Sequence, residues 1–145
     1  METENSMLDK AIALAVAAHS GQKDKYGSPY ILHPIRLTIK MRSEEEMITA
    51  ILHDVVEDTD WTLEGLEAEG FYHNIIEALD CLTRRDDETY EAYIERAALN
   101  PLARNIKLAD LEDNMDIKRM KTIDSNAVER LARYHKAWIR LTQKA

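Results

Sequence analysis

The 145-residue sequence has little of what stabilises small secreted proteins or embeds a protein in a membrane. It contains a single cysteine, Cys81, so disulfides do not staple the fold and a cytoplasmic location is expected. No apolar run approaches the roughly 18–20 residues that a membrane-spanning helix needs. Residues 1–4 are acidic and lack the basic flank and apolar core of a signal peptide. We therefore expect one soluble domain, residues 1–145, with no membrane as partner.

Positive charge is also scarce. The 27 Asp and Glu residues outnumber the 19 Lys and Arg residues, which gives a net charge of −8. Non-specific binding to nucleic acids depends on a positive surface that releases counterions, so no nucleic-acid polymer is expected as a partner. A small anionic substrate is still compatible with this charge, because a metal ion and a few Lys or Arg residues set the field inside a pocket.

Glycine and proline are few, with four and three residues, and no alternation of β-branched residues is sustained. Helical periodicity dominates instead, which predicts an all-α fold with loops over residues 21–32 and 84–88. Capping residues and prolines mark where helices should begin. These places are near Asn5 or Ser6, directly after His33-Pro34, at Ser43, at Thr62, at residue 72, at Asn100-Pro101 and at Asp124-Ser125.

The most informative segment is residues 51–59, an apolar stretch that carries His53, Asp54, Glu57 and Asp58. If the helix continues through it, Glu57 lies one turn after His53 and Asp54 and shares their face. Such a cluster does little for a helix that must bury its apolar side, and a bound metal with a carboxylate base explains it better. We expect Glu57 to take a proton from the attacking water and Asp58 to orient that water or the leaving group.

Two more residues of the metal-binding type lie elsewhere, His33 in the segment 29–34 and Asp110 at the end of the segment 106–110. Two histidines and two aspartates from three segments can form one site, which would suit Mn²⁺, Fe²⁺, Zn²⁺ or Mg²⁺. A metal with open positions makes bound water acidic enough to supply hydroxide. The set therefore predicts a metal-dependent hydrolase. Asn114, one turn after Asp110, is expected to point into the same site and bind a substrate hydroxyl or base.

Cationic side chains that a phosphate ester would need are available near these residues. The candidates are Lys23, Lys25, Arg84 and Lys107, together with Arg85 and Arg104. Each could equally be a solvated residue at a helix end. His19, which ends the first helix, is expected to be a hydrogen-bonded structural group rather than a ligand.

Four motifs occur in a characteristic order along the chain. They are Ala18-His19-Ser20-Gly21-Gln22, Gly27-Ser28-Pro29-Tyr30-Ile31-Leu32-His33-Pro34, His53-Asp54-Val55-Val56-Glu57-Asp58-Thr59 and Ile106-Lys107-Leu108-Ala109-Asp110. From about residue 7 to residue 120, the chain resembles the HD-type hydrolase domain of the RelA/SpoT family and its stand-alone form, the small alarmone hydrolases. A lone His-Asp pair would be a weak signal, whereas four motifs in this order are highly specific.

The resemblance implies an all-helical HD domain that removes the 3′-pyrophosphate from (p)ppGpp and gives GDP or GTP and pyrophosphate. It implies one Mn²⁺ ion with four ligands, His33, His53, Asp54 and Asp110. Glu57 and Asp58 match the pair that activates water in the family, and Asn114 matches an Asn that contacts the nucleoside. No synthetase or regulatory domain follows before Ala145, so an alarmone enzyme of this sequence is expected only to degrade.

The sequence departs from the family pattern at two places. Asp24 stands where the family usually has an Arg that stacks on guanine, so we count Asp24 among the substrate-contacting candidates. The residues after Asp110 are Leu111-Glu112-Asp113-Asn114 instead of Arg-x-His-Asn. Guanine specificity therefore stays open, and the alternative is an HD phosphohydrolase for ppApp, the 2′-phosphate of NADPH or a nucleoside monophosphate.

A third hypothesis is a nucleotide sensor that uses the metal only as a clamp. The intact pair Glu57 and Asp58 speaks against it, because a sensor does not need to activate water. The amphipathic last helix, which carries Tyr134 and Trp138, would serve a homodimer as readily as the core.

Overall fold

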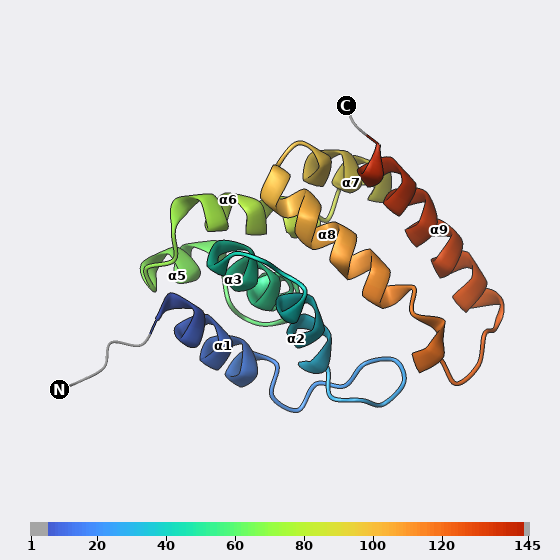
Figure 1. Ribbon diagram of the computed structural model, residues 1–145, viewed down its shortest axis with the longest axis horizontal. Coiled ribbons are helices and arrows are strands. Elements are labelled where there is room, and N and C mark those ends of the chain that lie inside the picture. The colour runs from blue at the N-terminus through green and yellow to red at the C-terminus, as the bar shows by residue number, and fades with distance from the viewer. Residues whose placement is uncertain (1–5, 144–145) are drawn as a thin grey trace.

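The computed structural model describes residues 6–143, and within them the chain forms helices and loops without a strand (Figure 1). The α-helices are α1 Met7–Ala18, α2 Leu32–Ile39, α3 Glu44–Leu52, α4 Val55–Asp58, α5 Leu63–Ala68, α6 His73–Leu82, α7 Tyr90–Ala98, α8 Pro101–Asn114 and α9 Ser125–Thr142, with a short 3₁₀ helix, η1 Ile117–Arg119. The predicted all-α class is confirmed. The acidic residues 1–4 and the candidate cap Asn5 lie outside the described residues.

Most helices begin where the sequence predicts, and the capping residues explain why. At five predicted starts a side-chain oxygen accepts the backbone N–H three residues later, which satisfies a donor that has no partner inside the helix. These caps are Ser6, Ser43, Thr62, Asn100 and Asp124. One start differs, because α2 begins at Leu32 and contains His33 and Pro34 instead of following them. Pro34 is tolerated there because the first N–H groups of a helix are unpaired in any case.

The predicted continuous helix through residues 51–59 is wrong. Helix α3 ends at Leu52, and α4 begins again at Val55. Asp54, at the break, has φ −106° and ψ 1°, and the His53 ring donates from Nδ1 to the Ala50 carbonyl at 2.7 Å. Glu57 and Asp58 therefore belong to a separate one-turn helix, and their position does not follow from the period of α3.

Helix α8 lies at the centre of the fold and packs against α2, α3, α6, α7 and α9 (Figure 1). One apolar cluster lies among α1, α3, α5 and α6, a second joins α2, α3, α6 and α8, and a third joins α7, α8 and α9. The second cluster includes Leu37, Ala50 and Ile106, all fully buried. Its burial brings α2, the end of α3 and α8 side by side, which is where the polar residues of three motifs meet.

Helix α9 packs on α7 and α8, and its large aromatic residues have partners within the chain. Tyr134 and Trp138 pack against the third apolar cluster. Trp138 donates its indole N–H to Glu112 at 3.1 Å. None of the helices within residues 6–143 is long and apolar enough to cross a bilayer.

Candidate active site

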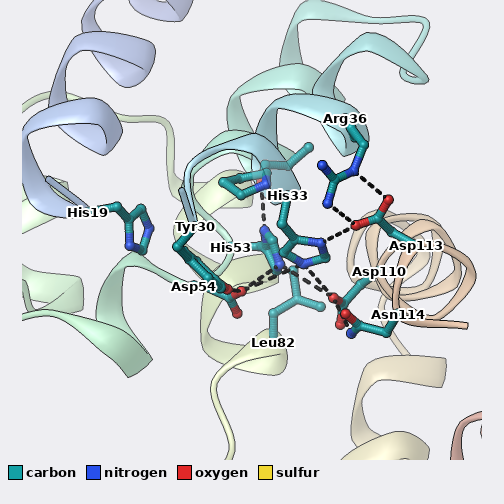
Figure 2. A network of polar contacts seen from close by, with 12 residues as sticks. His19, Tyr30, His33, Arg36, His53, Asp54, Leu82, Asp110, Asp113 and Asn114 are labelled. Carbon is teal, nitrogen blue, oxygen red and sulfur yellow. Dashed lines mark hydrogen bonds and ion pairs between the residues drawn. The ribbon is translucent and has the colours of Figure 1, made fainter. Parts of the chain in front are cut away.

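The four residues expected to bind a metal come together between α2, α3 and α8 (Figure 2). His33 Nε2 lies 2.9 Å from Asp110 Oδ1 and 3.9 Å from Asp54 Oδ2. His53 Nε2 lies 2.9 Å from Asp54 Oδ2 and 3.6 Å from Asp110 Oδ1. Ligand atoms of His33, His53 and Asp54 all lie within 4.8 Å of one another. Both imidazoles and the Asp110 side chain are buried.

The hydrogen bonds of the two rings show what the cluster can hold. His53 donates its Nδ1 proton to the Ala50 carbonyl, and His33 donates its Nδ1 proton to Asp113 at 2.6 Å. A neutral imidazole has one proton, so each Nε2 then presents a lone pair to a carboxylate oxygen. His53 Nε2 is buried and has no hydrogen-bond partner among residues 6–143. A divalent cation placed among these acceptors removes the repulsion, so the residues fit a metal ion.

The neighbouring carboxylates also raise the pKa of both histidine rings. Burial opposes a charge on His53, yet Asp54 beside it outweighs burial and raises the pKa of the ring. Burial likewise opposes a charge on His33, but hydrogen bonds to Asp110 and Asp113 raise its pKa. The cluster therefore attracts positive charge, either as protons or as a metal ion.

Lys107 contacts Asp110 and is not among the residues that line the cavity beside the cluster. Its Nζ donates to Asp110 Oδ2 at 2.8 Å and lies 5.0 Å from the centre of the Tyr93 ring. Burial alone would raise the pKa of Asp110, but Lys107 holds that pKa well below its usual value. Asn114 donates to Asp110 Oδ1 at 3.1 Å, so it points into the site as expected.

Two residues that sequence reasoning missed orient the candidate ligands. The Tyr30 hydroxyl donates to Asp54, and Asp113 accepts from His33 and from Arg36, whose Nε and NH2 lie 2.8 and 2.9 Å away. Burial raises the pKa of Asp113, but the bonds from His33 and Arg36 outweigh it and hold the pKa far below the ordinary value. The signal for Asp113 was its spacing, since a residue three after Asp110 shares its helix face.

Glu57 and Asp58 lie on α4, next to the cluster but on its exposed side. Partial removal from water, followed by the negative charge of Asp54, raises the pKa of both carboxyl groups. Neither residue lines the cavity that opens beside the cluster. Asp58 instead lines a separate shallow hollow with Gln22 and Trp61.

A cavity of about 310 Å³ opens beside the cluster. Its lining consists of Lys23, Asp24, Lys25, Tyr26, Tyr30, His33, Asp54, Asp110, Asn114, Asp116, Arg119, Met120, Arg130, Leu131 and Tyr134. Four of the six predicted substrate contacts are among them, namely Lys23, Asp24, Lys25 and Asn114. Arg84 is not, since it is exposed and lies 5.8 Å from the centre of the Tyr90 ring.

The side of the cavity built by η1 and α9 was not predicted. Lys25 and Arg130 both line the cavity. Burial lowers the pKa of Lys25, and the positive charges of Arg130 and Arg133 lower it further. Asp24 Oδ1 accepts from the backbone N–H groups of residues 26 and 28, while Oδ2 lies 4.0 Å from Arg119 NH1. The carboxylate at position 24 is thus faced by a cation from η1.

The chain is similar to known proteins with two named activities. The chain is 32% identical over 120 residues to a guanosine-3′,5′-bis(diphosphate) 3′-pyrophosphohydrolase of Aquifex aeolicus, covering 74% of this chain and 17% of that protein. It is 31% identical over 139 residues to a GTP pyrophosphokinase of Streptomyces coelicolor, covering 87% of this chain and 16% of that protein. The chain thus spans about a sixth of the length of these curated relatives. No family model matches it.

A solved structure matches over nearly the whole chain. It is described as a metazoan ortholog of SpoT that hydrolyses ppGpp and plays a role in starvation responses. The two chains superpose with a TM-score of 0.77 at 25% identity, and the match covers 97% of this chain and 88% of the other.

Proposed function

Since this chain belongs to the RelA/SpoT family of HD-domain proteins, we propose that it removes the 3′-pyrophosphate from (p)ppGpp and releases GDP or GTP. The observation that carries the proposal is the meeting of His33, His53, Asp54 and Asp110 beside a cavity with cationic residues at its mouth. Phosphate esters need this combination of charge stabilisation and positioning.

We propose that these four residues hold one Mn²⁺ ion. When bound, the ion supplies an acidic water and a positive charge beside the phosphate. Tyr30 and Asp113 hold Asp54 and His33 in place through the hydrogen bonds described above. Lys107 acts in this proposal through Asp110, whose negative charge it stabilises.

Glu57 is the proposed general base, since it lies on the turn directly after Asp54 and near its charge. It takes one proton from the attacking water, whose oxygen joins the pyrophosphate as the bond from phosphorus to the 3′ oxygen breaks. Asp58, next to it, orients the water. The 3′ oxygen takes up a proton from solvent and Glu57 releases its proton to solvent, so the products are GDP or GTP and pyrophosphate.

We propose that Lys23 and Lys25 contact the phosphates and that Asn114 contacts the nucleoside, because all three line the cavity. A role for Arg84 stays a prediction of the sequence, as do a homodimer and a cytoplasmic location.

One observation favours a second candidate, a hydrolase for another nucleotide. Asp24 lines the cavity and brings negative charge to its mouth. In the family that the sequence resembles, an Arg usually stands at this position and stacks on guanine. A substrate whose base donates hydrogen bonds to a carboxylate would then be preferred over one that relies on stacking.

Product analysis decides among these candidates. Purified protein with Mn²⁺ is incubated with ppGpp, pppGpp, ppApp, NADPH and nucleoside monophosphates, and Glu57→Gln serves as the control for contaminating activity. Pyrophosphate with GDP or GTP is the expected result. Orthophosphate release, or turnover confined to another nucleotide, would favour the second candidate. Tight binding without turnover of any of them would favour a sensor.

A further inference from the structure

Helix α4 is too short to hold itself in place. It comprises only the four residues Val55–Asp58, and a single helical turn is unstable on its own. Yet it carries both acidic residues assigned to the water-activating pair. Something outside α4 must therefore fix its position.

The far end of α4 is held by Gln22. The Gln22 side-chain amide donates from Nε2 to the carbonyl of Asp58 at 3.0 Å, across 36 residues of sequence. Asp58 is the last residue of α4, and the last carbonyl groups of a helix have no N–H donor within that helix. This bond therefore attaches α4 to the loop that follows α1.

His19 determines which way the Gln22 amide faces. His19 Nδ1 lies 2.8 Å from Gln22 Oε1, so the ring donates to the amide oxygen and turns the NH₂ group toward Asp58. The His19 side chain is 2% exposed, which fixes the ring. A buried ring with this contact leaves Gln22 one amide orientation.

The near end of α4 is held by Tyr30. Its hydroxyl donates to Asp54, the residue that immediately precedes α4, and its ring lies against His19 with centroids 5.0 Å apart (Figure 2). His19 thus contacts both residues that hold α4, one at each end of the helix.

We infer that His19, Gln22 and Tyr30 form a strap that positions α4, and with it Glu57 and Asp58, against the metal cluster. The three are positioning residues, since their contacts run through α4 and Asp54. The expected effect on turnover rests on the proposed function, whereas the expected effect on the rigidity of α4 does not.

Gln22→Met tests the strap, because methionine has a similar size but neither donates to Asp58 nor accepts from His19. We expect the amides of Asp58 and Thr59, which close the α4 turn, to exchange hydrogen about tenfold faster. We expect kcat to fall about tenfold with KM within twofold, because a displacement of about 1 Å is enough for a large loss of rate.

Thr62→Ala is the matched control. Thr62 caps α5, another short helix, which carries none of the site residues. This variant should lower Tm about as much as Gln22→Met while kcat and the exchange of the α4 amides stay unchanged. A loss of kcat in both variants to the same degree would overturn the strap, because general destabilisation would explain it.

His19 provides a second, independent variant. His19→Asn keeps a donor near the position of Nδ1 and should preserve kcat and slow exchange in α4, whereas His19→Leu should reproduce Gln22→Met. Unchanged exchange of the α4 amides in Gln22→Met would overturn the strap whatever the enzyme hydrolyses. Faster exchange in a protein that turns over no nucleotide would support the strap and overturn the proposed function alone.

Discussion

The cavity has two walls that differ in how firmly their side chains are held. The inner wall comprises His33, Asp54 and Asp110, with His53 behind them, and each of these side chains contacts another member of the cluster. The outer wall comprises Arg119, Met120, Arg130, Leu131 and Tyr134, which come from η1, α9 and the connection between them. All five of these residues are only half-buried.

This difference separates two properties of the site. The inner wall lies on helices that share a buried core, so its geometry is fixed before any ligand arrives, as metal binding requires. The outer wall offers positive charge near solvent, where we expect it to affect affinity and choice of substrate more than chemistry. Changes in the inner wall should therefore alter metal binding and kcat, and changes in the outer wall should alter KM.

The largest expected effect comes from His53→Ala. In the wild-type protein, Mn²⁺ at about 100 times its Kd should stabilise the fold by about 2.7 kcal/mol, which raises Tm by several degrees. Without the buried Nε2 of His53, both this rise and turnover should be lost. His135→Ala, which changes an exposed histidine, should keep both. An undiminished rise of Tm in His53→Ala would remove His53 from the metal site.

Glu57→Gln should separate catalysis from metal binding. We expect kcat to fall by about 10²–10⁴, the usual range for loss of a general base, while the rise of Tm with Mn²⁺ persists. Glu64→Gln on α5 is the control for removing one exposed carboxylate. If Glu57→Gln turns over at the wild-type rate, then another group takes the proton from water.

Asp113→Asn should weaken the inner wall without removing a ligand. Asparagine accepts less strongly from His33 and Arg36, so the His33 ring loses its fixed orientation. Mn²⁺ affinity measured by calorimetry should fall about 10–100-fold. Asp80→Asn on α6 serves as the control, because its side chain is 49% exposed and pairs with Arg85 instead of a candidate ligand. Equal affinities in wild type and Asp113→Asn would show that His33 is fixed by other contacts.

The contrast between the walls also explains what the sequence could predict. Helix starts follow from local capping chemistry, so the helix starts at Ser43 and Asn100 could be predicted from the sequence. The candidate metal ligands could also be predicted, because they stand in short motifs. The break in the helix at Asp54 could not be predicted from the sequence, because it accompanies a hydrogen bond from Tyr30, 24 residues earlier. No local rule predicts such a bond, and the helical period through residues 51–59 pointed to a continuous helix.

The outer wall was missed for a related reason. The amphipathic pattern of α9 shows that one face is buried, but not against which neighbours. Packing of α9 on α7 and α8 decides that Arg130 and Tyr134 face the cavity. Arg119 on η1 forms an ion pair at 4.0 Å with Asp24, 95 residues away in sequence, which no local pattern predicts.

Arg130→Ala tests whether the outer wall affects KM and not kcat. Arg130 lines the cavity and contributes to the positive charge around Lys25, so its loss should raise KM about 3–10-fold and leave kcat within about twofold. The effect should shrink as salt is added, because exposed charges are screened. Arg140→Ala is the control, since Arg140 on the same helix pairs with Glu95 and is not among the residues that line the cavity. A loss confined to kcat would contradict the division of roles between the walls.

The smallest effect on the site is expected from a third region, the pair of Glu88 and Arg96, neither of which lines the cavity. Arg96 donates to both carboxylate oxygens of Glu88, at 2.8 and 2.9 Å, and these bonds lower the pKa of Glu88 to about 2. A carboxyl group whose pKa is lowered on folding stabilises the fold fully above its ordinary pKa near 4.5, and the contribution disappears as pH falls toward 2.

Glu88→Gln should therefore lower the free energy of unfolding by about 1–2 kcal/mol at pH 7, a modest value because solvent screens the pair. Below pH 4.5 the two proteins should converge, as measured by urea unfolding across pH, while Mn²⁺ affinity and kcat at pH 7 stay at wild-type values. A difference in the free energy of unfolding that does not change with pH would mean that Glu88 stabilises the fold through packing against Arg96 and not through its charge. A change in Mn²⁺ affinity would mean that the inner wall depends on the connection between α6 and α7, and is less self-contained than its own contacts indicate.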